Sequence, residues 1–143
     1  MIEILIDEDI EESIEIKNKL VEKLVEKIIS DNNKSFSLVN FIITNDNKLS
    51  QLKRDFFNQD VLTDVITFNL EEKNEPIEGE VYISFERIKE NAKQFNQKIS
   101  IELCRIIVHG TLHLIGFDDI TSIGKEKMTT LENHYIKNMP EIL

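Results

Sequence analysis

The sequence has no tryptophan, one cysteine, two prolines and four glycines in 143 residues. A single cysteine cannot form an internal disulfide, so Cys104, which lies in an apolar run, is interpreted as a reduced core residue in a reducing compartment. No apolar run approaches the roughly 20 residues that span a bilayer. The segment Met1–Asp7 lacks the basic residues that open a signal peptide. We therefore expect a cytoplasmic protein without a membrane role.

The length of 143 residues corresponds to one domain, and we expect a single core formed by residues 1–143. Scarce proline and glycine argue against collagen-like and low-complexity chains. The 17 basic and 27 acidic residues give a net charge of −10, which argues against a broad nucleic-acid-binding surface. Residues 87–105 are locally basic, so a polyanion can still dock there. Ordinary solvated helix faces are the alternative interpretation.

Hydrophobic periodicity predicts four strands and five helices in one α/β or α+β layer architecture. The expected strands are residues 2–6, 36–44, 61–70 and 81–84, and the expected helices are residues 14–29, 45–57, 86–97, 101–115 and 122–138. Ser100 and Thr121 are the expected N-caps of the last two helices, and Ser84 or a neighbour is expected to begin the third. The pattern does not specify the strand order.

The most informative segment is IELCRIIVHGTLHLIGFDD, residues 101–119. It is apolar on nearly all sides, yet Arg105, His109 and His113 recur every four residues and form one polar stripe. Two histidines at this spacing on one helix face can both direct a ring nitrogen at a metal ion. A pair of hydrogen-bonded core histidines is the alternative.

A third ligand is available after the predicted helix. Gly116 can end the helix in a left-handed turn and bring Asp118 and Asp119 back toward the histidines. His109, His113 and Asp119 then offer two imidazoles and one carboxylate, the ligand set of a catalytic zinc site. We expect one Zn²⁺ per chain. Because one ligand is a carboxylate, another divalent metal is a second possibility.

The same histidine spacing occurs in metzincin proteases, which carry a glutamate directly after the first histidine as the general base. Gly110 occupies that position here. A small metalloprotease is therefore the weaker alternative, because its proton acceptor is missing.

Three segments resemble those of the YbeY family of bacterial endoribonucleases and ribosomal RNA maturation factors. HGTLHLIGFDD (109–119) is similar to the family signature HGxLHLxGYDH, DVLTDVITF (60–68) to DxPTDVLSF, and GEVYIS (79–84) to GDIxIS. Met128 and Glu132 also stand where the last helix of the family carries such residues. The resemblance spans nearly the whole chain in order.

This resemblance implies a mixed four-stranded sheet with surrounding helices, a zinc ion held by the signature, and metal-dependent cleavage of single-stranded RNA. The implied setting is maturation of the 3′ end of small-subunit ribosomal RNA and ribosome quality control. Ribosomal RNA, the small ribosomal subunit or its precursors, and ribosomal proteins would be the partners. A ribosome-assembly factor that does not cleave RNA, and whose metal is only structural, is the main alternative.

Two departures from the family pattern affect the site. The third ligand of the family is usually histidine, whereas Asp119 makes the metal a weaker Lewis acid. Asp118 would then orient a ligand histidine or cap the last helix. Phe57 replaces a family arginine, and Arg54 and Arg105 are the candidates that would supply its charge.

Several residues have two open interpretations. Arg105 can instead form a salt bridge with Glu102 or another acid. The side chains of Phe56, Phe57 and Phe68 can stack on bases or belong to the core. Asp64 and Thr67 would shape the cleft or end a strand. Leu62 and Asn69 stand where the family has prolines, which suggests looser loops. His134 is expected to be exposed.

Overall fold

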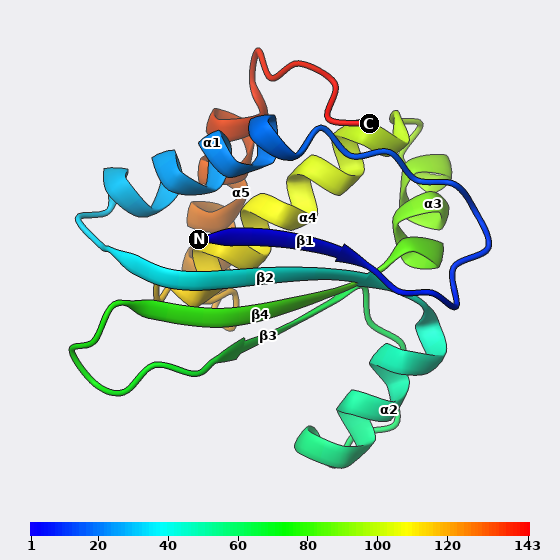
Figure 1. The fold of residues 1–143 in the computed structure, drawn as a ribbon, viewed down its shortest axis with the longest axis horizontal. Helices are drawn as coiled ribbons and strands as arrows, with labels where there is room; N and C mark the ends of the chain where they lie inside the picture. The colour runs from blue at the N-terminus through cyan, green and yellow to red at the C-terminus, as the bar shows by residue number, and fades with distance from the viewer.

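The computed structural model describes all 143 residues, as four strands and five helices (Figure 1). In chain order the elements are β1 (Ile2–Ile6), α1 (Asn18–Asp31), β2 (Phe36–Thr44), α2 (Asp46–Phe57), β3 (Val65–Asn69), β4 (Ile77–Ser84), α3 (Phe85–Gln94), α4 (Ile99–Leu114) and α5 (Ser122–Ile136). No helix is both long and apolar enough to cross a lipid bilayer.

The strands form one mixed sheet in the order β1-β2-β4-β3. β1, β2 and β4 run parallel, and β3 pairs antiparallel with β4 at the sheet edge. Parallel neighbours require crossover connections, and α1 supplies one between β1 and β2. The α/β class and the four-stranded mixed sheet are therefore confirmed.

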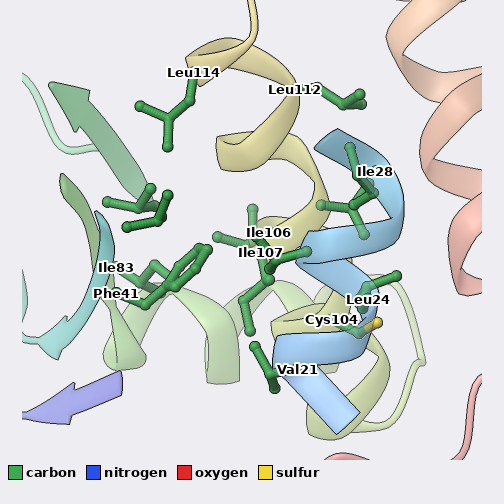
Figure 2. Close-up of a cluster of buried hydrophobic side chains, with 14 of the residues drawn as sticks. Val21, Leu24, Ile28, Phe41, Ile83, Cys104, Ile106, Ile107, Leu112 and Leu114 are labelled. Atoms are coloured by element: carbon green, nitrogen blue, oxygen red, sulfur yellow. The ribbon is translucent and has the colours of Figure 1, made fainter. Parts of the chain in front are cut away.

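Helices cover the two faces of the sheet unequally. α1, α3, α4 and α5 lie on one face and α2 lies on the other (Figure 1). The first face encloses a core of 25 buried residues. Figure 2 shows Ile106 and Ile107 of α4 between the strand residues Phe41 and Ile83 and the side chains of α1. α4 is apolar on most sides because it packs against the sheet and against α1, α3 and α5.

The predicted caps are confirmed at two helices and wrong at one. Ser84 begins α3 by accepting a hydrogen bond from the Arg87 amide, and Thr121 begins α5 by accepting one from the Gly124 amide. α4 begins instead after Lys98, and the Ser100 hydroxyl accepts hydrogen bonds from the amides of Ile142 and Leu143. Ser100 thus fixes the C-terminal segment and does not cap α4.

Most helix and strand boundaries also differ from the prediction by one to four residues. Residues 61–64 and Leu70 are not in β3, whose ladder with β4 runs only from Val65 opposite Ile83 to Asn69 opposite Gly79. β4 begins earlier, at Ile77, whose amide donates to the Ser35 carbonyl. Residues 14–17 precede α1 in a nonhelical conformation, and the Lys17 amide donates to the carbonyl of Ile142 near the C-terminus.

Candidate metal centre

His109 and His113 lie one turn apart near the C-terminal end of α4 and point at the same place. Their Nε2 atoms are 3.0 Å apart, and the side chains of His109 and His113 are 20% and 24% exposed. The surrounding helix is held by the main core, which fixes the direction of both rings. The polar stripe predicted on this helix is therefore present, with its two histidines converging.

Gly116 turns the chain after α4 so that Asp119 approaches the two histidines. Its φ of +109° is the left-handed conformation that glycine adopts readily. The Gly116 amide donates to the His113 carbonyl and the Phe117 amide to the Leu112 carbonyl, which is the Schellman arrangement for ending a helix. Asp119 then lies with its carboxylate oxygens 3.5 Å from His109 Nε2 and 3.7 Å from His113 Nε2.

The donor set fits a divalent cation. His109 Nδ1 contacts the Glu132 carboxylate at 2.7 Å and His113 Nδ1 contacts the Phe117 carbonyl at 3.1 Å. Because both partners are acceptors, each Nδ1 carries a proton, and the two Nε2 lone pairs face each other. Their repulsion is relieved by a cation between them. The three separations also bracket the edge of about 3.3 Å that a tetrahedral zinc with bonds of about 2.0–2.1 Å would need.

Glu132 on α5 was not recognised in the sequence as part of this site. One of its carboxylate oxygens accepts from His109, and the other forms a salt bridge of 3.2 Å with the Arg105 guanidinium. A carboxylate behind a ligand histidine fixes its tautomer and makes it a stronger ligand. Arg105 also donates to Asn133, so the structure favours the ion-pair interpretation of Arg105 over phosphate binding.

Asp118 has neither of its expected roles. Its carboxylate accepts from the amide of Ile120, two residues later, whereas Thr121 caps α5. The backbone carbonyl of Phe117 and the carboxylate of Glu132 orient the histidines instead.

The environments of the two histidines shift their pKa values in opposite directions. Burial of the His109 ring lowers its pKa, but the hydrogen bond and charge of Glu132, with Asp119 and Asp64, outweigh burial and raise it overall. Burial and the neighbouring His109 lower the pKa of His113. The Glu132 charge that favours a proton on His109 also favours a bound cation there.

A cavity of about 340 Å³ opens beside the three candidate ligands. The segment 63–67 lines it, so Asp64 and Thr67 border the cleft, and Lys53 and Phe57 of α2 line it as well. Asn58 directly follows α2, and its φ of +52° turns the chain back toward β3. Lys53 was missed in the sequence because nothing in its local pattern distinguishes it from other surface lysines.

Other predicted features lie outside this cavity. The Arg54 guanidinium lies 3.6 Å from Asp60 and also contacts Gln51, so the structure does not bring Arg54 to the histidines. Four cations of the basic segment 87–105 are in ion pairs, at Arg87, Lys89, Lys98 and Arg105. That segment is therefore largely neutralised. His134 is exposed and packs edge-on against Tyr135, as expected.

Gly110 disfavours the metzincin-like protease alternative in steric terms. A Cβ atom at this position would lie 2.7 Å from Cγ1 of Val81, a fully buried residue of β4. The helix face at Gly110 is therefore packed against the sheet, and a glutamate there has no room. The position that supplies the general base in metzincins is unavailable for one in this fold.

Comparison with known proteins agrees with the fold and with the family resemblance of the sequence. The family model described as Endoribonuclease YbeY matches residues 6–140. Endoribonuclease YbeY of Amoebophilus asiaticus is 41% identical over 98 residues, which cover 68% of this chain and 67% of the relative. The corresponding protein of Flavobacterium psychrophilum is 38% identical over 109 residues, covering 76% of this chain and 77% of the relative.

A solved structure shares the fold over nearly the whole chain. The solution structure of TM1509 from Thermotoga maritima superposes with a TM-score of 0.63 at 30% identity, covering 96% of this chain and 87% of that one. The family match, the relatives and the shared fold agree with the resemblance found in the segments 60–68, 79–84 and 109–119. This chain belongs to the YbeY endoribonuclease family.

Proposed function

We propose that this protein is a metal-dependent endoribonuclease that cleaves single-stranded RNA during maturation of the 3′ end of small-subunit ribosomal RNA and in ribosome quality control. The observation that carries the proposal is the convergence of His109, His113 and Asp119 beside a cavity of about 340 Å³, in a chain of an endoribonuclease family. Ribosomal RNA, precursor small subunits and ribosomal proteins in the cytoplasm are the proposed partners.

His109, His113 and Asp119 would hold one divalent cation, with zinc as the first candidate. When bound, such a cation supplies Lewis-acid chemistry, which activates a water or polarises the scissile phosphate and the attacking hydroxyl. Glu132 holds the His109 ring in one tautomer and the Phe117 carbonyl does the same for His113. Asp119 adds a negative charge that a third imidazole would not, so the centre is a weaker Lewis acid and accepts metals other than zinc more readily.

The cavity favours a single strand over a duplex. Its volume of about 340 Å³ is at the lower end of ordinary ligand sites, about 300–1,000 Å³. Bases in single strands and loops can be splayed out individually, whereas those of a duplex are stacked and paired. The net charge of −10 also disfavours extended phosphate binding, so we expect recognition to be confined to the cavity.

The first experiment measures metal content by mass spectrometry in protein purified without chelators, comparing wild type with Asp119→Ala. We expect about one zinc per chain in the wild type and a large loss in the variant. Cleavage of single-stranded RNA is then measured for wild type and His113→Ala. We expect His113→Ala to abolish metal binding and cleavage while the domain remains folded. Cleavage retained by His113→Ala would refute the proposal.

A structural metal in a noncatalytic ribosome-assembly factor makes a different prediction. In that case chelation should unfold the protein, and pure protein should bind precursor ribosomes without cutting RNA. The three candidate ligands lie within one helix end and its following turn, outside the core of 25 buried residues. We therefore expect the circular dichroism spectrum to survive chelation while cleavage is lost.

A further inference from the structure

Two side chains of α2 face the candidate metal centre across the cavity. Lys53 and Phe57 are one helical turn apart and both line the cavity that His109, His113 and Asp119 border. The Lys53 ammonium lies 4.6 Å from the centre of the Phe57 ring. We call this pair the Lys53–Phe57 wall. It places a cation and an aromatic face together beside the proposed reaction site.

Lys53 is the only lysine or arginine that lines the cavity, and it is in no ion pair. Its neighbour Arg54 is bound to Asp60, and Arg105, on the other side of His109, is bound to Glu132. A chain with a net charge of −10 offers a phosphate little long-range attraction. A phosphate that enters the cavity therefore has Lys53 as its available cation.

The aromatic ring of Phe57 is held in place by packing on a neighbouring ring. The residue is 43% exposed, yet its ring stacks on Phe68 with centroids 5.9 Å apart and planes inclined by 29°. Phe68 is held in turn by an edge contact of 5.9 Å with Tyr82 of β4. The Lys53 ammonium lies over this ring, so a base stacks on it when the flexible lysine side chain moves aside toward a phosphate. A preoriented ring loses little conformational freedom in such stacking.

We propose that the Lys53–Phe57 wall holds one nucleotide of the RNA strand next to the scissile phosphate, with the base stacked on Phe57 and a phosphate bound by Lys53. Single-strand binding proteins combine aromatic platforms with cations in this way. Stacking tolerates any base, so the wall positions RNA without selecting a sequence. This inference rests on the proposed function for its substrate, and the test below measures binding separately from cleavage.

The binding test uses a fluorescently labelled single-stranded oligouridine, the full-length protein and a chelator that prevents cleavage. Fluorescence anisotropy gives Kd over a range of salt concentrations for wild type, Lys53→Gln, Lys53→Arg and Phe57→Leu. Leucine keeps an apolar group packed on Phe68 but removes the stacking face, so folding is preserved. Circular dichroism checks each variant.

The two residues should give different signatures. Lys53→Gln should weaken binding and reduce the slope of log Kd against log salt by about 0.7, the value for one phosphate contact in a single strand. Lys53→Arg should restore both. Phe57→Leu should weaken binding by roughly tenfold with an unchanged salt slope, since stacking on one aromatic ring is worth about 1–3 kcal/mol. An oligomer with abasic sites should abolish that difference.

Matched variants separate the wall from its neighbours. Lys19→Gln removes an exposed lysine of α1 and should leave Kd unchanged. Phe56→Leu alters the other ring that packs on Phe68, at 5.3 Å, without lining the cavity. Equal losses in Phe56→Leu and Phe57→Leu would show that only packing on Phe68 matters and would overturn the stacking role. A larger loss in Arg54→Gln than in Lys53→Gln would overturn the role of Lys53.

Cleavage assays then distinguish this inference from the proposed function. If wild-type protein with added zinc or manganese cuts no RNA while the binding differences persist, the proposed function fails and the wall remains supported. If the protein cuts RNA and Lys53→Gln and Phe57→Leu bind and cut as well as wild type, the wall fails and the proposed function remains.

Discussion

The two faces of the sheet differ in how firmly they hold the proposed site. The face covered by α1, α3, α4 and α5 encloses 25 buried residues, whereas the face covered by α2 has a cluster of three: Leu49, Leu52 and Ile66. The candidate metal ligands come from α4 and the turn after it, on the thickly covered face. The Lys53–Phe57 wall comes from α2, on the thinly covered one.

This difference matches what each half of the site must do. Ligand atoms around a small cation need positions fixed to fractions of an ångström, which a large packed core provides. A wall that receives different nucleotides benefits from small movements, which few buried contacts permit. We infer that the half proposed to bind metal is stable and the half proposed to hold RNA is adaptable.

The largest expected effect concerns the core on the face covered by α1, α3, α4 and α5. Phe41 of β2 is fully buried beneath α4, and Phe41→Ala should lower the free energy of unfolding by about 3–5 kcal/mol. Urea unfolding followed by circular dichroism measures this. Leu5→Ala, at a half-exposed residue of β1, is the control and should cost much less. Similar losses in the two variants would contradict the view that this core dominates the stability.

The second prediction concerns the face covered by α2. Leu49 is fully buried in the small cluster under α2, and Leu49→Ala should destabilise by about 2–3 kcal/mol, at the lower end for such changes, because a small cluster can relax. Amide hydrogen exchange should accelerate mainly in α2, and RNA binding should weaken while zinc affinity is retained. A parallel loss of zinc affinity would show that the two faces are not independent.

The sequence predicted the elements better than the site. The strands 2–6 and 36–44 are correct because their apolar runs are bounded by polar turns, and the histidine pair was found because helical spacing is local. Glu132 contacts His109 from 23 residues away, and Lys53 reaches the cavity only because α2 folds beside β3. Such contacts depend on the tertiary arrangement, which the local pattern does not specify.

The third prediction tests whether a residue of α5 also affects the affinity of the candidate site for zinc. Glu132→Gln keeps the shape of the side chain but removes the charge behind His109, and should weaken zinc affinity by about 10–100-fold. Competition with a chromophoric zinc chelator measures this. Glu126→Gln, at an exposed position of the same helix, should leave the affinity unchanged. Unchanged affinity in Glu132→Gln would mean that Glu132 serves only as the partner of Arg105.

The fourth prediction concerns the pH dependence of stability at a contact between α1 and α5. Tyr135 of α5 donates a hydrogen bond of 2.9 Å to the Asp31 carboxylate of α1. Burial, with this hydrogen bond, raises the pKa of Tyr135 to about 12. The contribution to folding stability is therefore complete below the unfolded tyrosine pKa of about 10 and is lost as the pH rises toward about 12.

Tyr135→Phe isolates that contribution. The variant should be less stable than wild type at neutral pH, and the difference in urea midpoint should shrink as the pH rises above about 10. The hydrogen bond from Tyr135 also holds the pKa of Asp31 below its usual value, so the wild-type advantage should fall again in acid, below about pH 3.8. A constant difference at all pH values would mean that the phenol contributes by packing alone.

The smallest effect is expected at the edge of α2, where charge lies close to the cavity without lining it. The salt bridge between Arg54 and Asp60 spans 3.6 Å and its carboxylate is 89% exposed. Exposed pairs of this kind contribute little, so Arg54→Gln should change the free energy of unfolding by less than about 0.5 kcal/mol. Urea unfolding at low and high salt measures the change, with Lys19→Gln as the reference. Strong destabilisation of α2 by Arg54→Gln would mean that this surface ion pair, and not the buried cluster around Leu49, fixes α2 against the sheet.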